Sequence, residues 1–376
     1  MTEVLPGILN ALHMSFAMFW EILWGLILGF ALSAAVQAVV SKSEMSRLLP
    51  DDSPRSAVKA AALGAASSSC SYAAVALTRS IFRKGANFTS SLIFEIASTN
   101  LVIELGIIML VLLGWQFTAA EFLGAPVIIT IIIILCRAFL TERLVDRARK
   151  QAERGIKGIM EGHAEMDMSI TEGPLLQRIF SSDGLTAISH YFVMDWYSIW
   201  KDIVGGLLLA GALAAWVPRD FWQGLFFSSH PFWAKLWGPL VGPLVAIASF
   251  VCSIGNVPLA AVLWNGGISF GGVIAFIYGD LLIIPILDIY RKYYGWKMMW
   301  FILGTFYVAF VCSALAIEFL FQAAGWIPEH RQAQIVMAAV ALNYTTILNI
   351  MFLLVAGFLL FRFFKTGGLK MLRGMS

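Results

Sequence analysis

The chain contains seven apolar runs, each long enough to cross a lipid bilayer. A membrane-spanning helix needs roughly 20 apolar residues, and the runs cover residues 13–40, 87–113, 119–140, 187–217, 268–289, 298–322 and 334–361. Only 13% of the 376 residues are charged, whereas a soluble domain carries about 25%. The sequence therefore predicts an all-α polytopic membrane protein that has the lipid bilayer as a partner. Its basic residues form short clusters between apolar runs, so no nucleic-acid partner is expected.

Two further segments, 57–86 and 239–267, are apolar but crowded with small and helix-breaking residues. If both cross the membrane, the Lys and Arg residues divide almost evenly between its two sides. If both are re-entrant hairpins, 23 of the 26 Lys and Arg lie on one side, and only Arg219, Lys235 and Arg331 lie on the other. Because cytoplasmic loops are enriched in Lys and Arg, we expect re-entrant hairpins, an outer N-terminus and an inner C-terminus.

The two halves of the chain are related by an internal repeat. An offset of 182 residues places Cys70 on Cys252 and Gly85 on Gly267, and an offset of 181 places Gly114 on Gly295. Each half reads as span, hairpin, span, span, and three spans are an odd number, so we expect the second copy to be inverted in the membrane. Inverted repeats are typical of secondary transporters. The alternative is that the small residues of the hairpins only allow close helix packing.

This pattern predicts four regions along the chain. The first transmembrane repeat covers 1–141 with its hairpin at 57–86, and a charged cytoplasmic linker covers 142–185. The second repeat covers 186–322 with its hairpin at 239–267, and 323–376 forms an extra span with a basic cytoplasmic tail. Non-helical backbone survives at membrane depth only when it is buried in protein or lines a wet cavity. Two hairpins therefore indicate a pathway through the protein.

Acidic residues inside the apolar runs are functional candidates, because a charge in the bilayer is costly. We expect Glu95 and Asp280 to carry coupling protons or ions. Glu104 follows Glu95 by nine residues, so on an unbroken helix it would face away from the same site, which makes it the weaker candidate. Asn100 and Asp280 lie in stretches that weaken their helices and offer oxygens to a solute. For three other acids a local hydrogen bond is an equally good explanation: Glu21, Asp202 and Glu318.

The hairpin tips combine thiols, hydroxyls and an amide. Thiols favour soft, thiophilic partners, while hydroxyls and exposed backbone amides bind anions. We expect Cys70 and Cys252 to contact the solute, and five further residues to orient it together with Asn100. These five are Ser68, Ser69, Ser71, Ser253 and Asn256. The alternative is that each cysteine is a small buried apolar residue, which is also our interpretation of Cys136 and Cys312.

The sequence lacks the common motifs of enzymes and metal sites. It contains no HExxH, no GxSxG and no GxxxxGK[ST], and the single His in residues 162–167 lies in an acidic loop. We expect neither catalysis, nor a cofactor, nor a bound metal.

Several blocks resemble a known family. Residues 65–74, 83–86, 97–104, 251–260 and 279–280 look like those of the bacterial predicted-permease family that includes the organoarsenical efflux permeases. The resemblance covers most of the chain outside the linker, and the paired Cys-Ser hairpins are fairly specific. It implies a permease of the bacterial plasma membrane. For the arsenical branch it implies export of trivalent methylated or aromatic arsenicals along a thiol-containing path.

Three functions agree with these features. The leading hypothesis is a secondary permease that moves a small solute by alternating access, with efflux of trivalent organoarsenicals or of another thiophilic or small anionic solute. One alternative is a channel-like anion-conducting protein whose hairpin amides form a filter. The other is a membrane subunit or scaffold, docked through residues 334–361 and the linker. The sequence leaves open whether the chain forms a homo-oligomer.

Overall fold

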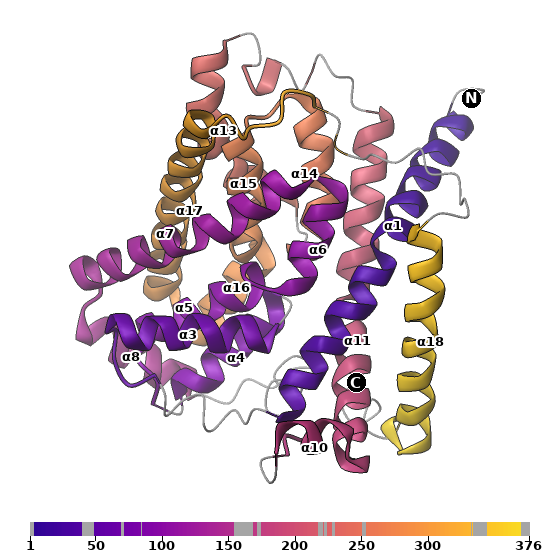
Figure 1. Ribbon diagram of the computed structural model, residues 1–376. Helices are drawn as coiled ribbons and strands as arrows, with labels where there is room; N and C mark the ends of the chain where they lie inside the picture. The colour runs from indigo at the N-terminus through magenta and orange to yellow at the C-terminus, as the bar shows by residue number, and fades with distance from the viewer. Residues whose placement is uncertain are drawn as a thin grey trace.

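The protein is built from α-helices, as the computed structural model in Figure 1 shows. The structure describes residues 4–39, 49–68, 71–83, 85–153, 168–170, 174–216, 221, 224–227, 230–249, 253–331, 333 and 344–369, and no strand occurs among them. The all-α prediction is therefore confirmed. The main helices are α1 (Val4–Val39), α3 (Pro54–Ser67), α4 (Ser71–Arg83), α5 (Phe88–Asn100), α6 (Ile103–Leu112), α7 (Trp115–Phe139), α8 (Glu142–Ala152), α10 (Leu175–Phe180), α11 (Ser182–Trp216), α13 (Pro231–Ser249), α14 (Ser253–Gly266), α15 (Phe270–Tyr278), the 3-10 turn η1 (Gly279–Leu282), α16 (Ile284–Tyr294), α17 (Trp296–Ala324) and α18 (Tyr344–Lys365).

The helices are long and apolar enough to cross a membrane several times. Within the described part of the chain, five single helices meet this test, and two helix pairs bent by 42° raise the number to seven. The bent pairs are α5 with α6 and α15–η1 with α16. The seven are not the seven expected runs, because α13 meets the test whereas in α11 only the shorter stretch Ile203–Leu213 is apolar.

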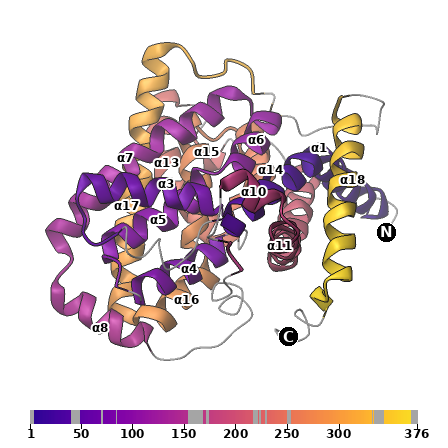
Figure 2. The same ribbon diagram turned by 60° about the horizontal axis from the view of Figure 1, so that its bottom comes forward.

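Three long helices form one side of the molecule. Figures 1 and 2 show α1, α11 and α18 side by side, next to the bundle made by the other helices. The Ser15 hydroxyl of α1 donates to the Leu207 carbonyl of α11 over 2.9 Å. The Asn349 amide of α18 donates to the Trp20 carbonyl over 2.7 Å and accepts from the Trp24 N–H over 2.9 Å. These bonds attach the additional helix α18 to α1.

Helices α3 and α4 form the first hairpin, whose two ends lie together. The Asn87 N–H, after α4, donates to the Leu49 carbonyl, before α3, over 2.9 Å. The Ser90 hydroxyl donates to the Asp51 carbonyl over 2.5 Å. The chain therefore returns to the place from which the hairpin started. This is the geometry that a re-entrant segment requires, and its position in the bilayer stays a prediction.

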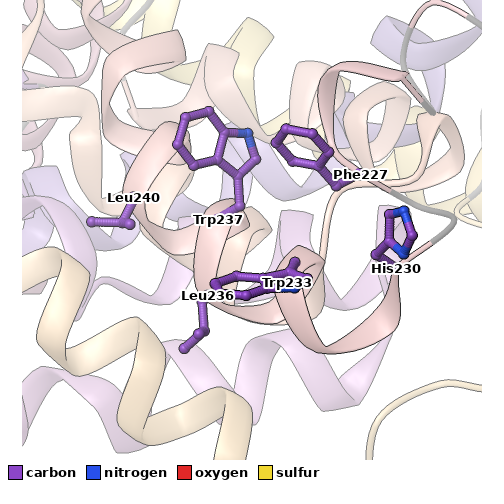
Figure 3. A pocket seen from close by; sticks show the side chains of 6 residues that line it. All are labelled: Phe227, His230, Trp233, Leu236, Trp237 and Leu240. Carbon is purple, nitrogen blue, oxygen red and sulfur yellow. The ribbon is translucent and has the colours of Figure 1, made fainter.

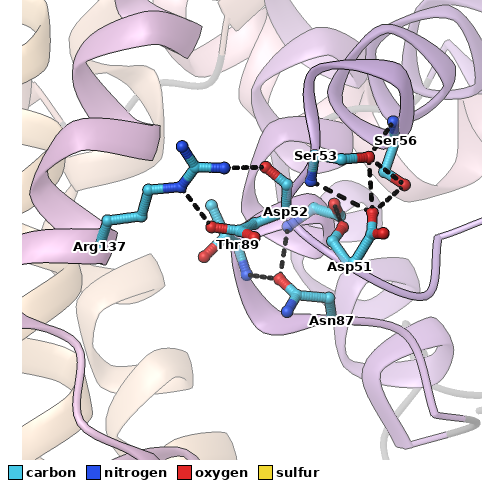
Figure 4. Close-up of polar contacts among 8 residues, drawn as sticks. Asp51, Asp52, Ser53, Ser56, Asn87, Thr89 and Arg137 are labelled. Carbon is cyan, nitrogen blue, oxygen red and sulfur yellow. Dashed lines mark hydrogen bonds and ion pairs between the residues drawn. The ribbon is translucent and has the colours of Figure 1, made fainter.

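A polar cluster holds the start of this hairpin (Figure 4). Ser53 caps α3 by accepting from the Ser56 N–H, and hydrogen bonds from the Ser56 and Ser53 side chains hold the pKa of Asp51 below its ordinary value. Arg137, near the end of α7, pairs with the Asp52 carboxylate over 2.7 Å. Because this pair is partly exposed, it contributes little to the stability of the fold, but it ties α7 to the hairpin start.

Helices α13 and α14 form the second hairpin, and its parts correspond to those of the first. The same 182-residue offset relates the positive-φ glycines that follow the two hairpins, Gly85 (φ 107°) and Gly267 (φ 114°). Side chains disfavour this backbone conformation, which glycine adopts freely. The element order α3–α7 is thus repeated by α13–α17, with a 42° bend in each copy. The opposite orientation of the two copies in a membrane stays a prediction.

Glycines bring each hairpin against its broken span. A Cβ added to Gly64 of α3 would lie 2.3 Å from the Phe94 carbonyl oxygen and 2.8 Å from the Ala97 Cβ of α5. In the second half the glycine lies in the broken span and not in the hairpin. A Cβ added to Gly279 of η1 would lie 2.5 Å from the Ala246 Cβ of α13. The two contacts are related by the 182-residue offset. Both copies therefore need one residue without a side chain at this crossing.

Several expected boundaries differ from the observed ones. The expected linker reaches residue 185, but α11 already begins at Ser182. The expected spans 87–113 and 268–289 are each interrupted, and the second continues to Tyr294. Of the expected run 334–361, residues 334–343 lie outside the described residues, as does most of the linker between 154 and 173. Apolar composition predicts which segments lie in the bilayer. It does not show where a helix breaks, because helix breaks depend on backbone contacts.

We predict that Arg55→Cys and Arg83→Cys, each in a chain without native cysteines, react with a membrane-impermeant thiol reagent from the same side. Both positions are exposed and flank the first hairpin, whose ends are joined by hydrogen bonds. Labelling in right-side-out and everted vesicles measures this. Glu329→Cys serves as the control for the opposite side, and reaction of the two hairpin positions from opposite sides would contradict a re-entrant segment.

We also predict that Gly64→Ala destabilises the protein by about 1–3 kcal/mol, as overpacking does elsewhere. The added Cβ would meet the backbone of α5. Gly304→Ala is the matched control, since nothing lies within 4 Å of a Cβ there. Thermal unfolding in detergent measures both variants, and an unchanged midpoint for Gly64→Ala would show that α3 and α5 can separate at no cost.

Candidate functional site

The two hairpins meet at a buried carboxylate. Ser71 is the first residue of α4, and Ser253, its partner in the repeat, is the first residue of α14. The Ser253 N–H donates to the Ser71 hydroxyl oxygen over 3.4 Å, and the Ser71 hydroxyl donates to Asp280 Oδ2 over 2.7 Å. All three residues are buried. Two hairpins and one broken span, from both halves of the chain, therefore converge on one acid.

The broken span that carries Asp280 changes conformation around this residue. Helix α15 ends at Tyr278, the 3-10 turn η1 holds Asp280, and Ile283 is extended (φ −59°, ψ 146°) before α16 begins. Pro285 lies in the first turn of α16, a position where its missing N–H costs nothing. Helix α5 breaks similarly, at the extended residue Val102. Such breaks leave backbone polar groups that can serve a solute.

Glu95 of α5 is the second buried acid of the site. It accepts a hydrogen bond from the Tyr290 hydroxyl of α16, while its Oε2 has no hydrogen-bond partner. Glu95 and Asp280 interact electrostatically, and Asp280 Oδ1 also lacks a partner. A buried carboxylate oxygen without a partner is costly unless a proton or a ligand joins it. The structure thus places both expected acids near each other and leaves each with an open oxygen.

Glu104 also reaches a hairpin tip. It accepts a hydrogen bond from the Ser68 hydroxyl, directly after α3. An unbroken helix would turn Glu104 away from the face that carries Glu95, but the break at Leu101–Val102 removes that restriction. Helical phase therefore does not make Glu104 a weaker candidate than Glu95.

Two buried amides complete the described polar residues of the site. Asn100 ends α5 and donates to Thr99 Oγ1 over 3.1 Å, while its Oδ1 has no partner. Asn256 of α14 accepts from the Ser249 hydroxyl over 3.4 Å, while its Nδ2 has no partner. Together with the two acids, these side chains offer open donors and acceptors to a small polar ligand.

Some sequence candidates lie outside the described residues. These are Ser69, Cys70 and Cys252, so the thiol path stays a prediction. The side chains of Glu21 and Asp202 are likewise not described. Cys136 is buried in α7, and Cys312 is exposed on α17. Glu318 of α17 accepts a hydrogen bond from the Gly271 N–H of α15.

Sequence reasoning missed one acid, Glu121. It is fully buried in α7, and neither of its carboxylate oxygens has a hydrogen-bond partner. It interacts electrostatically with Asp280, and the Tyr278 hydroxyl donates to its backbone carbonyl over 3.2 Å. The signal was present, because Glu121 stands in the apolar run 119–140 and meets the same criterion as Glu95.

A cavity of about 530 Å³ lies elsewhere, around the start of α13. Figure 3 shows its lining, which is Phe227, His230, Trp233, Leu236, Trp237 and Leu240. No acid is among the described residues of this lining, and such aromatic side chains are typical of the membrane interface. Among the described residues no group of three His, Cys, Asp or Glu could hold a metal ion. The converging hairpins therefore remain the better candidate site.

Comparisons with known proteins confirm the resemblance to a predicted-permease family. A family model described as a predicted permease matches residues 8–319. The chain is 61% identical over 338 residues to "Putative permease Rv2963" of Mycobacterium tuberculosis, which covers 90% of this chain and 83% of that protein. It is 26% identical over 144 residues to "UPF0718 protein YraQ" of Escherichia coli, 38% of this chain and 39% of that one. No solved structure matches the chain.

We predict that Glu121→Met stabilises the fold by about 1–3 kcal/mol, since it replaces two unpartnered buried oxygens with apolar atoms of similar volume. The midpoint of thermal unfolding in detergent measures the change. Glu142→Gln, at the exposed start of α8, is the control and should leave the midpoint unchanged. A lower midpoint for Glu121→Met would mean that this carboxylate contributes to the stability of the fold.

Proposed function

Because the chain belongs to the predicted-permease family and folds as a multi-pass helical membrane protein, we propose that it is a secondary permease that moves a small solute by alternating access. The observation that supports this most directly is the contact of Ser71 with Asp280. It joins a hairpin of one half to a broken span of the other at a fully buried acid. Movement of one half against the other would open or close the path at this point.

The acids would couple this movement to a proton or ion gradient. Asp280 and Glu95 each have one oxygen bound to a hydroxyl and one oxygen without a partner. When a proton binds to the free oxygen, the buried charge disappears and its desolvation cost with it. A protonated Asp280 also binds the Ser71 hydroxyl differently, because it can donate as well as accept. Protonation would therefore change how firmly the two halves hold each other.

The solute would be small and soft, or a small anion. Cys70 and Cys252 offer thiols to a thiophilic solute, and Ser68, Ser69, Ser71, Ser253, Asn256 and Asn100 offer hydroxyls and amides. The family resemblance favours trivalent organoarsenicals, exported across a bacterial plasma membrane. Efflux of trivalent organoarsenicals is therefore the proposed activity.

The test is uptake into everted vesicles that carry the protein, because uptake there corresponds to export from the cell. The vesicles are challenged in parallel with trivalent methylarsenite, arsenite and a thiol-inert anion, with and without a proton gradient. We expect gradient-dependent accumulation of methylarsenite only. Both the double variant Cys70→Ser, Cys252→Ser and the single variant Asp280→Asn should lower the rate at least tenfold.

Asp288→Asn is the matched control for the acid. Asp288 lies on α16 at the protein surface and pairs with Lys292 and Arg291, so its loss should leave uptake unchanged. Accumulation that survives in Asp280→Asn and needs no gradient would contradict proton coupling and indicate a channel. No accumulation of any of the three solutes would exclude these substrates and favour a membrane subunit of a larger complex.

A further inference from the structure

An arginine covers the end of the first hairpin. The Arg149 guanidinium, on α8, donates from Nη1 to the Phe82 carbonyl over 2.5 Å and from Nη2 to the Ala86 carbonyl over 3.2 Å. Its Cζ lies 4.1 Å from the centroid of the Phe82 ring. These contacts form what we term the inner clamp: Arg149 with Phe82 and Ala86.

A second arginine covers the end of the second hairpin in the same way. Arg331, after α17, donates from Nη1 to the Trp264 carbonyl over 3.0 Å and to the Ile268 carbonyl over 2.7 Å. Its Cζ lies 4.5 Å from the centroid of the Trp264 ring. We term this group the outer clamp: Arg331 with Trp264 and Ile268. Its three residues follow those of the inner clamp by the same 182 positions.

The chemistry explains why both sites hold arginine. The last carbonyls of a helix lack intrahelical partners and carry partial negative charge. After each hairpin a positive-φ glycine, Gly85 or Gly267, turns the chain, so the carbonyls on either side of the turn approach one cation. Only arginine combines a permanent charge with a planar guanidinium that donates several hydrogen bonds and lies over an aromatic ring. Lysine would keep the charge but lose the planar guanidinium.

The two clamps lie at opposite ends of the bundle. In Figure 1, α8 lies in its lower part, whereas the segment that follows α17 crosses its upper part beside α14. The charge pattern agrees with this, since Arg149 belongs to the basic side and Arg331 is one of three basic residues on the other side. Each clamp therefore faces a different side of the expected membrane.

Both clamps are formed at the same time, and the site between them is closed. Ser71 and Asp280 are 0% exposed, although each hairpin tip touches this centre. Each clamp is backed by a second contact. Near the inner clamp, Arg79 of α4 donates to the Ala152 carbonyl over 2.8 Å. Near the outer clamp, Asn265 donates to the Ala333 carbonyl over 3.0 Å.

The outer clamp also borders open space. A cavity of about 370 Å³ is lined by Arg331, Trp264, Ser269, Glu318 and Lys235, among others. The Glu318 carboxylate in this lining can accept from the Arg331 guanidinium, so release of this clamp does not leave a buried charge alone.

The geometry points to Arg149 and Arg331 as a pair of positioning residues for transport, each of which holds the base of one hairpin and closes the path on its own side. Release of the inner clamp would open the central site to the inside, and release of the outer clamp would open it to the outside. This inference rests on the proposed function, since it assigns the clamps to the two openings of alternating access. It concerns residues that contact the hairpins, not the solute.

The experiment measures access to the centre without any solute. Ser71→Cys, in the full chain with its four native cysteines replaced, places a thiol at the point where the hairpins meet. A membrane-impermeant methanethiosulfonate is applied to right-side-out and to everted vesicles, and the rate of labelling is recorded. Arg149→Gln should raise the rate from the inner side at least threefold and leave the outer rate unchanged. Arg331→Gln should do the reverse.

Two further variants separate positioning from plain stability. Arg149→Lys and Arg331→Lys keep the charge but lose the planar guanidinium over the aromatic ring, so they should give smaller shifts on the same sides. If a Gln variant fails to fold, its Lys counterpart decides the question. Arg291→Gln is the matched control, because Arg291 lies over the Trp296 ring at 5.2 Å and pairs with Asp288, and these contacts are not with a hairpin carbonyl. It should change neither rate.

Two outcomes would overturn the inference. Equal increases on both sides would mean that the arginines only stabilise the fold, and unchanged rates would mean that they do not hold the hairpins closed. Because labelling needs no transported solute, this result is independent of the vesicle uptake assay. Sided changes without uptake of any tested solute would keep the clamps and reject the substrate, whereas uptake with unsided labelling would reject the clamps alone.

Discussion

Buried backbone polar groups need partners inside the protein, and this chain interrupts its helices repeatedly. The interruptions lie between α3 and α4, α5 and α6, α13 and α14, and α15 and α16. Ser71, Ser253 and Asp280 stand at three of them and bind one another. The fourth, between α5 and α6, brings Glu104 to Ser68. The broken helices therefore support each other, and this mutual support fixes where the two halves of the chain meet.

The repeat gives the two halves equivalent parts with different chemistry. Ser71 and Ser253 are equivalent and bind directly, while Asp280 has no acidic equivalent at the corresponding position, Ser98. Glu95 and Glu121 supply acids from the first half instead, both in electrostatic reach of Asp280. A site built in this way has one central carboxylate and two neighbours, so a single proton or cation would change the balance of the whole cluster.

Open polar atoms at the centre carry a cost that the packing around them has to offset. Glu95, Asn100, Glu121, Asn256 and Asp280 each have at least one unpartnered buried atom, and each such atom costs about 1–3 kcal/mol. The broken spans of the site carry large buried aromatic side chains such as Phe94, Phe276 and Tyr290. A rigid apolar frame around an undersatisfied polar centre is the arrangement expected of a binding site, where a ligand supplies the missing partners.

Composition and charge determined several features of this protein without reference to its structure. Apolar runs predict an all-α membrane protein because the bilayer admits little else, and the 182-residue offset predicts equivalent parts because similar segments fold similarly. Glu95 and Asp280 are candidates from the sequence because a charge in an apolar run is costly. Glu121 could have been found by the same criterion. The arginine clamps were not, since Arg149 and Arg331 stand outside the apolar runs.

The tertiary structure decided which of these residues meet. Helical phase separated Glu104 from Glu95, and only the break at Leu101–Val102 brings Glu104 to the tip of the first hairpin. Contacts between residues 182 or more positions apart, such as Ser71 with Ser253 and with Asp280, depend on how the two halves pack. Local patterns specify helices and their depth in the membrane. The pairing of distant polar groups depends on backbone breaks and glycine crossings, which appear only when the whole chain is folded.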